Sequence, residues 1–159
     1  MPKCTILVGV PASGKSTWFS KNKTSTMAPI STDNIIEFMG SLFGFTYDQI
    51  FKDSISLAEK IMWKRLEWNA ERSNDVVIDR TNLTAKSRKK FIDFLKPYGY
   101  EFEAVVFPLP GTAEFSEEEW FRRLDSRQGK TIPNSVLASM VDSAEMPTEE
   151  EGFTKITVL

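Results

Sequence analysis

The stretch that most constrains the fold of this chain is GVPASGKS, residues 9–16, which follows the apolar run CTILV. It matches the pattern G-x-x-x-x-G-K-[ST] in full and lies between a strand-like and a helix-like segment, as that pattern requires. Gly9 and Gly14 permit a tight turn. The backbone N–H groups of this turn, with those of Ala12 and Ser13, are expected to point at phosphate oxygens. The stretch therefore predicts a nucleoside-triphosphate site.

Three side chains at the end of this loop have expected roles at that site. Lys15 reaches the β- and γ-phosphates, Ser16 is placed to ligate Mg²⁺, and Thr17 can contact the α-phosphate. The helix that begins here adds the positive end of its dipole to the field of the loop. A glycine turn with an incidental Lys-Ser pair is the alternative, and the strand and helix context disfavours it. ATP or another nucleoside triphosphate, together with Mg²⁺, is the expected cofactor.

Short apolar runs alternate with helical periodicity along the whole chain. Strands are expected at 4–9, 28–32, 75–80, 101–107 and 153–159. Helices are expected over 16–22, 34–43, 85–96, 114–127 and 134–144, with a longer one that starts at the capping-box stretch TYDQ near Thr46. This alternation predicts βαβ units around a mainly parallel sheet in a three-layered α/β fold. No repeat or linker divides the chain, so residues 1–159 are expected to form one domain.

The composition excludes several kinds of chemistry. The chain has no histidine, which excludes Ser-His-Asp and Cys-His catalysis and any His-ligated metal site. Its one cysteine, Cys4, cannot form an internal disulfide and fits a reducing compartment. No apolar run approaches the ~20 residues of a membrane span, and no signal peptide is visible. We expect a cytoplasmic protein with no membrane contact and no obligatory protein partner.

Asp33 lies in the stretch PISTDNIIEF, just after the second expected strand. Ligands of parallel α/β sheets gather at the carboxyl ends of the strands, so this acid faces the same edge as the phosphate loop. A carboxylate there can orient an acceptor hydroxyl and accept its proton during phosphoryl transfer. Asp is also favoured as a helix N-cap, and Asn34 and Glu37 have the spacing of a capping box. The local sequence leaves both interpretations open.

The stretch DRTNL, residues 79–83, ends the third expected strand. Asp79 is similar in position to the acid that holds Mg²⁺ or its waters in P-loop NTPases, and a turn-stabilising role is the alternative. Thr81 and Asn82 can line an acceptor pocket or cap the helix that follows.

A pair of arginines lies in RRLDSRQGK, residues 122–130. Arg123 and Arg127 are four apart and so are expected on one helical face, in a mobile lid over about 114–133. Two guanidiniums suit a triphosphate, and one can act in cis as an arginine finger. The alternative is a solvated basic face paired with the acidic run at 117–119.

In this order, the motifs resemble the kinase domain of the phage-type 5′-polynucleotide kinases, within the P-loop kinase superfamily. The matching stretches, which span nearly the whole chain, are GVPASGKST, STDN, DRTNLTAKSRKKF, and R-x-x-x-R followed by K-x-I-P-x-x-V-L-x-S-M. The resemblance implies an all-parallel sheet of order 2-3-1-4-5 under a helical lid. It implies that Lys15 and Ser16 serve ATP·Mg²⁺ and that Asp33 is the general base. It also implies that Arg127 stabilises the γ-phosphoryl group and that Arg123 is the next lid contact.

The chain departs from that family on the acceptor side. Thr32 and Ile36 stand where members of the bifunctional type carry arginines for the acceptor's phosphates. Arg80 stands directly before Thr-Asn, where the family has its strand-three acid, so either Asp79 or Arg80 can take that role. Other residues must therefore bind the acceptor in this chain. The candidates are Arg80 and the basic run Lys86, Arg88, Lys89 and Lys90. The basic run fits an exposed helix face equally well.

The expected function is ATP-dependent phosphoryl transfer to the 5′-hydroxyl of a DNA or RNA end. Because the net charge is −2, such nucleic-acid binding would depend on a local patch. One alternative is a kinase for a small hydroxyl acceptor, such as a nucleoside, sugar or antibiotic. The other is a nucleotide-binding regulatory module that has no acceptor.

Overall fold

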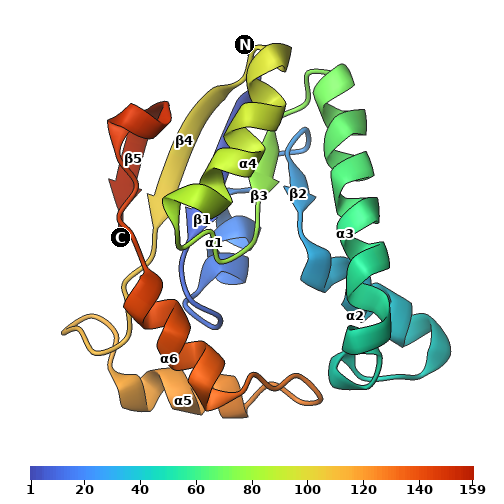
Figure 1. Cartoon of the computed structure of the whole chain (residues 1–159), viewed down its shortest axis with the longest axis vertical. Helices are drawn as coiled ribbons and strands as arrows, with labels where there is room; N and C mark the ends of the chain where they lie inside the picture. Colours follow the sequence, from blue (N-terminus) through green and yellow to red (C-terminus); the bar gives the residue numbers. More distant parts are fainter.

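Five parallel strands form one sheet in the order β2-β3-β1-β4-β5 in the computed structural model, which describes all 159 residues (Figure 1). The strands are β1 Lys3–Val8, β2 Ala28–Ile30, β3 Val76–Ile78, β4 Glu101–Val106 and β5 Phe153–Val158. Every neighbouring pair in the sheet is parallel. The strand order and the parallel pairing confirm the fold class expected from the sequence.

The central strand β1 has both faces covered. From Cys4 to Val8 every residue is buried, which is why this stretch reads as a continuous apolar run and not as an alternation. Alternate residues enter two different cores, because side chains of a strand point to opposite faces. Ile6 lies in the large core and Leu7 in a smaller one, where Trp18 and Phe19 pack.

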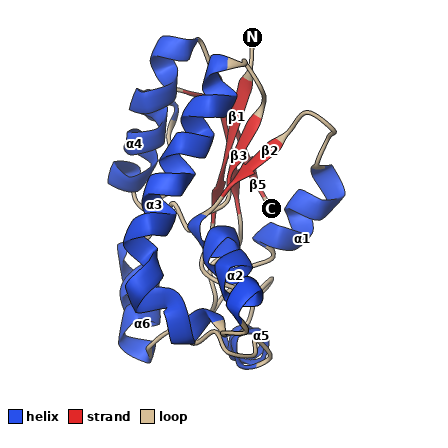
Figure 2. Ribbon diagram, turned by 90° about the vertical axis from the view of Figure 1, so that its right-hand side faces the viewer, coloured by secondary structure: helices blue, strands red, loops and turns tan.

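Helices cover both faces of the sheet and its lower end (Figure 2). They are α1 Lys15–Asn22, α2 Thr32–Phe43, α3 Tyr47–Glu71, α4 Ala85–Leu95, α5 Glu117–Asp125 and α6 Asn134–Ser143, with short 3-10 helices η1 Lys96–Tyr98 and η2 Glu149–Glu151. In Figure 2, α3 and α4 lie on one face of the sheet and α1 lies on the other. Helices α5 and α6 lie beyond the end of the sheet at which β1 and β4 terminate (Figure 1). None of the helices combines the length and apolar character that crossing a membrane requires.

Helix α3 begins as the sequence predicts. The Thr46 hydroxyl accepts a hydrogen bond from the Gln49 backbone N–H at 3.3 Å, and the Gln49 side chain accepts one from the Thr46 N–H at 2.7 Å. This reciprocal capping box satisfies two N–H groups that the helix cannot pair internally. The helix then packs Met62 and Leu66 fully into the large core.

The lid helix is shorter than expected. Helix α5 ends at Asp125, and the Arg127 N–H bonds to the Leu124 carbonyl in a tighter turn. The prediction that Arg123 and Arg127 share one helical face is therefore wrong, because Arg127 lies in the turn after the helix.

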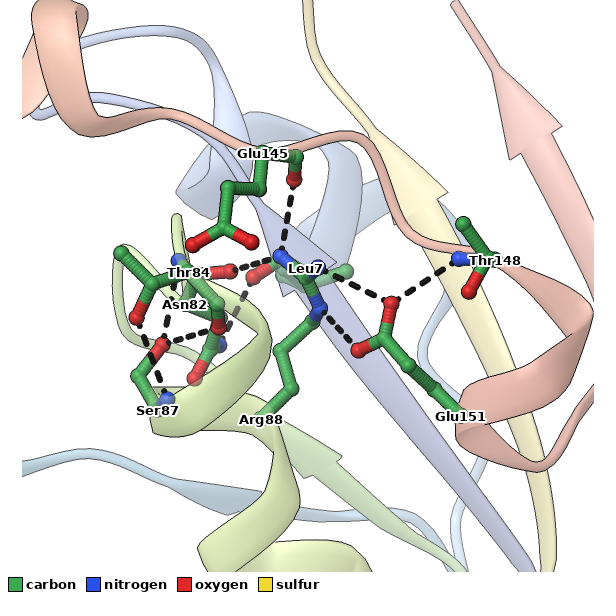
Figure 3. Close-up of polar contacts among 8 residues, drawn as sticks. All are labelled: Leu7, Asn82, Thr84, Ser87, Arg88, Glu145, Thr148 and Glu151. Atoms are coloured by element: carbon green, nitrogen blue, oxygen red, sulfur yellow. Dashed lines mark hydrogen bonds and ion pairs between the residues drawn. The ribbon is translucent and has the colours of Figure 1, made fainter.

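The basic run on α4 also differs from the prediction. Arg88 is fully buried, and its guanidinium donates hydrogen bonds to the Glu151 carboxylate and to the backbone carbonyls of Asn82 and Glu145 (Figure 3). Its neighbours Lys89 and Lys90 are exposed. The expectation that Arg88 helps to bind an acceptor is therefore wrong, because its fully buried guanidinium is bonded to groups of the protein itself.

Candidate active site

A cavity of about 1200 Å³ opens at the carboxyl ends of the strands, as expected for a parallel sheet. It is lined by residues that follow β1, β2, β3 and β4, and by α3, α6 and the turn after α5. The predicted site residues that line it are Ala12, Ser13, Gly14, Lys15, Ser16, Thr17, Asp33, Asp79, Arg80, Thr81, Arg123 and Arg127. Gly9 and Asn82 are the two predicted site residues that do not.

The phosphate loop has the shape that its sequence predicts. A Cβ added to Gly9 would lie 2.5 Å from the Ser13 Oγ and 2.9 Å from the Phe107 Cβ, so only glycine fits there. Ala12 and Gly14 adopt left-handed backbone conformations, with φ of 60° and 104°, just before α1. The Ser13 Oγ is buried and has no hydrogen-bond partner. This narrow loop at a helix N-terminus fits the phosphates of a nucleotide.

Lys15 lies at the head of α1 and is partly buried. Its ammonium donates hydrogen bonds to the carbonyls of Gly9 and Val10, at 2.8 and 2.7 Å. Burial lowers the pKa of Lys15 to about 8, although the charges of Asp79 and Asp33 act in the opposite direction. The lysine is thus bonded to the loop and is also subject to the charges of the two carboxylates of the cleft.

The structure resolves the ambiguity over which residue caps α2. Ser31 is the N-cap, and its hydroxyl accepts a hydrogen bond from the Asn34 N–H at 3.3 Å. Asp33 lies in the first turn, with its side chain in the cavity. The expected capping box of Asn34 with Glu37 does not form, because Asn34 lies inside the helix and not at its N-cap, and the Glu37 carboxylate accepts from Lys130. The Asp33 side chain is thus not needed as a cap.

Both oxygens of the Asp33 carboxylate are engaged. The Tyr47 hydroxyl donates to Oδ1 at 2.8 Å, and the Lys130 ammonium donates to Oδ2 at 2.9 Å. Burial alone raises the pKa of Asp33, but the charge of Lys130 and these two hydrogen bonds outweigh it and hold the pKa below the usual aspartate value. Asp33 is consequently an anion at neutral pH.

Asp79 has the opposite environment in the same cleft. Burial raises the pKa of Asp79 above the usual value, and Lys15 offsets this only in part. Two carboxyl groups whose pKa values are driven apart are a common feature of sites that move protons or bind metal ions.

Ser16 and Asp79 could hold Mg²⁺ together with the phosphates. The chain has no group of three His, Cys, Asp or Glu side chains that could hold a metal ion. Mg²⁺ commonly binds through one or two protein ligands, substrate phosphates and waters, so the two residues fit this metal. Their assignment stays a prediction.

The lid is fixed to the phosphate loop on one side. The Trp120 Nε1–H donates to the Pro11 carbonyl at 2.8 Å, and Arg123 donates to the Ala12 carbonyl at 3.3 Å. Glu119 accepts from Arg123 at 2.8 Å and also from Arg122. The acidic run therefore pairs with these two arginines but not with Arg127, which makes no side-chain hydrogen bond.

The lid is also fixed to the start of α3. The Asp48 N–H donates to the Gly129 carbonyl at 2.8 Å. The Asp48 carboxylate accepts from the Thr131 N–H at 2.9 Å and from its hydroxyl at 2.7 Å. A segment that the sequence predicts to be a mobile lid is thus held at both of its edges, with Lys130 between the two anchoring residues.

The strand-three loop is built differently from the expectation. Arg80 turns toward α3, where it donates to Glu59 at 2.8 Å, although it still lines the cavity. Asn82 is buried with φ of 47°, and its amide donates to the carbonyls of Leu7, Ile78 and Arg80. Neither expected role of Asn82 is found, because it holds backbone in place and Thr84 caps α4.

Sequence reasoning missed two residues of the site, Lys130 and Tyr47. Tyr47 belongs to the TYDQ stretch, whose capping pattern explained it locally. Lys130 is 97 positions from Asp33, and no local pattern links them. The one available signal for Lys130 was its place in the stretch K-x-I-P that carries the family resemblance.

Comparison with known proteins agrees with this geometry. The family model AAA_33, described as an AAA domain, matches residues 5–147. The bifunctional polynucleotide phosphatase/kinase of Schizosaccharomyces pombe is 28% identical over 153 residues, which make up 95% of this chain and 32% of that protein. The chain thus spans about a third of the length of this curated relative.

Solved structures give the same result. A chain of the Pnkp1/Rnl/Hen1 RNA repair complex aligns with a TM-score of 0.62 at 27% identity, covering 89% of this chain and 43% of that one. A chain of the PezAT toxin-antitoxin system of Streptococcus pneumoniae aligns with a TM-score of 0.70 at 19% identity, covering 99% and 66%, and shares the fold. The resemblance to polynucleotide kinases is confirmed. With a phosphate loop, a sheet order and a match over residues 5–147 that all agree, the chain belongs to the AAA-domain family AAA_33 and has the P-loop kinase fold.

Proposed function

We propose that this chain is an ATP-dependent kinase that phosphorylates the 5′-hydroxyl of a DNA or RNA end. The observation that carries the proposal is the ionised Asp33 carboxylate, held on both oxygens in the same cleft as the phosphate loop. A protein that only binds nucleotide has no use for such a base. The similarity to a polynucleotide phosphatase/kinase and to a chain of an RNA repair complex supports a nucleic-acid end as the acceptor.

Different residues of the chain have different roles in this reaction. The loop amides and Lys15 hold the β- and γ-phosphates of ATP. Ser16 and Asp79 would hold Mg²⁺, which would supply positive charge to the phosphates. Asp33 orients the 5′-hydroxyl and takes its proton as the oxygen bonds to the γ-phosphorus and the bond to ADP breaks. A carboxylate has about four lone-pair sites, so Asp33 can accept from Tyr47, Lys130 and an acceptor at once.

Arg127 completes the site as the cation for the transferring phosphoryl group. It lines the large cavity and also a second hollow of about 460 Å³ that Ala12 and Ser16 share. Its guanidinium has no ion-pair partner in the protein, in contrast to Arg122 and Arg123 on the same segment. An arginine without an internal partner is available to phosphate oxygens.

A kinase for a small hydroxyl acceptor is the second candidate, and the acceptor wall favours it. Ile36 is fully buried, so the position at which relatives of the bifunctional type carry an arginine cannot contact any acceptor. Glu37, an acid, lines the cavity one residue later. A carboxylate there would repel an acceptor phosphate placed near it.

One experiment separates these functions. ATP labelled on the γ-phosphate is incubated with matched 5′-hydroxyl DNA and RNA oligonucleotides, nucleosides, sugars and antibiotics, with Asp33→Asn as the inactive control. Transfer to oligonucleotide ends supports the proposal, and transfer confined to small molecules supports the second candidate. Hydrolysis alone, without transfer to any acceptor, would leave a nucleotide-binding module. Near-normal transfer by Asp33→Asn would overturn its role as the base.

A further inference from the structure

We propose that Lys130 is a positioning residue that holds and aims the Asp33 carboxylate only while the lid is docked, so that the base becomes competent when the lid closes. This inference rests on the proposed function, because it assigns Asp33 the role of base. The Lys130 ammonium lies 2.9 Å from the Asp33 Oδ2 and 2.9 Å from the Glu37 Oε1. It also lies 4.5 Å from the centre of the Tyr47 ring. The hydroxyl of Tyr47 donates the hydrogen bond that the other Asp33 oxygen accepts.

The position of Lys130 in the chain makes this contact conditional. Gly129 and Thr131, its immediate neighbours, are the two residues bonded to Asp48 at the start of α3. The lysine can therefore reach Asp33 only when this edge of the lid lies against α3. Lid docking and the orientation of Asp33 then become one event.

Lys130 also lies between the two hollows of the site. The large cavity and the smaller one share the same group of residues, which are Ala12, Ser16, Glu37, Tyr47, Arg127 and Lys130. The bonds from Lys130 to Asp33 and Glu37 cross from the lid to α2 where the two hollows meet. A cation at this place is in contact with the base and lines both hollows of the site.

No other cation makes a direct bond to Asp33. Arg127 from the lid and Lys15 from the phosphate loop interact with it only through space, as does the acid Asp79 just after β3. Glu37 from α2 shares the Lys130 ammonium with it. Tyr47 from α3 donates a hydrogen bond but carries no charge.

Without Lys130, burial and the neighbouring acids would act on Asp33 with less opposition. The pKa of Asp33 would then rise, and the carboxyl group would become protonated at a higher pH.

A simpler role for Lys130 is that of a fastener between the lid and α2, with no effect on the base. The Glu37→Gln variant separates these roles, because it removes the other partner of the same ammonium and leaves the pair with Asp33 intact. A fastener would be weakened by either change. A positioning residue needs only the bond to Asp33.

The direct test is a carboxyl ¹³C NMR titration that needs no acceptor. Asp33→Asn assigns the Asp33 resonance, and wild type is compared with Lys130→Met, Lys130→Arg and Glu37→Gln. Lys130→Met is expected to move the Asp33 midpoint to higher pH, and Lys130→Arg is expected to restore the wild-type midpoint. Glu37→Gln, which removes a neighbouring negative charge, should leave the midpoint at or below the wild-type value. Thermal melts establish that each variant is folded. An unchanged midpoint in folded Lys130→Met overturns the inference, as does an equal shift in Glu37→Gln.

Turnover provides the second readout. With an accepted substrate, Lys130→Met should lower kcat by roughly ten- to a hundredfold, part of the about 10²–10⁴ that a positioned base supplies, with little change in the KM for ATP. The loss should be largest at low pH, where the variant's base is protonated first. An NMR shift without transfer to any acceptor would retain the contact and reject the proposed function. Transfer without a shift of the Asp33 midpoint would retain the proposed function and reject the role of Lys130.

Discussion

Arg88 and Glu151, 63 positions apart, form a two-pronged ion pair at 2.7 and 3.0 Å with the guanidinium completely buried. The remaining arginine N–H group donates to the carbonyls of Asn82 and Glu145 (Figure 3). The Asn82 amide in turn holds the carbonyl of Leu7 at the end of β1. The pair therefore braces the strand-three loop against β1 and against the segment that leads to β5. That loop carries Asp79 into the cleft.

This arrangement predicts a large stability cost for Arg88→Met. The change leaves the Glu151 carboxylate and two carbonyls without their buried partner, and breaking a buried pair in this way typically costs about 3–5 kcal/mol. The free energy of unfolding in urea measures it. Lys89→Ala is the matched control, because Lys89 forms an exposed pair with Asp93 one turn later on the same helix. A control of this kind should change stability by less than about 1 kcal/mol. Similar small losses in both variants would contradict the bracing role.

The same pair predicts loss of stability in acid. Burial raises the pKa of Glu151, but the hydrogen bonds from Arg88 and Thr148 outweigh it and leave the pKa below the usual glutamate value. A folded-state pKa below the unfolded one means that the contribution is complete above the unfolded value and is lost as the pH falls through the folded one. Urea midpoints for wild type should fall over that acidic range. Glu151→Gln should be less stable at neutral pH, and its urea midpoint should depend less on pH. If the midpoints of variant and wild type fell equally in acid, Glu151 would not be the source of the acid sensitivity.

Local patterns predicted most of the fold. All five strands were located to within two residues. Strands β1 and β3 were readable as continuous apolar runs because both of their faces are buried, whereas the mostly exposed edge strand β5 was readable from the alternation of its residues. The capping box at Thr46 and the phosphate loop were equally readable, since each is decided by residues next to one another.

What the sequence did not reveal depends on partners that are distant in the chain. Arg88 lies on the apolar face of α4 with Phe91 and Leu95, unlike the exposed Lys89, but its partner Glu151 is 63 positions away. The partnership of Asp33 with Lys130 depends on how the lid docks. The residues that line the cleft were thus largely predictable apart from Tyr47 and Lys130, whereas their contacts were not.

The packing of the phosphate loop predicts that Gly9→Ala weakens ATP binding by more than tenfold. The added methyl group would approach the Ser13 Oγ to 2.5 Å and the Phe107 Cβ to 2.9 Å, so the loop must shift. Titration calorimetry with a non-hydrolysable ATP analogue measures the affinity. Gly99→Ala is the control, because nothing lies within 4 Å of its added methyl group although its φ of 77° also disfavours alanine. Equal affinities in the two variants would show that the loop tolerates the methyl group.

The three arginines at 122, 123 and 127 should affect the kinetics in different ways when each is replaced. Arg127→Ala is expected to lower kcat by about 10³–10⁵, the range seen for arginine fingers, with ATP affinity largely retained. Arg123→Ala should instead raise the KM for ATP, since Arg123 bonds to the Ala12 carbonyl of the phosphate loop. Arg122→Ala is the control, because its side chain is 68% exposed and pairs only with Glu119. Steady-state kinetics on the identified acceptor measure all three. A loss below tenfold in Arg127→Ala would make Arg127 a surface residue and transfer the stabilising role to another cation of the cleft, of which Lys130 is the nearest to Asp33.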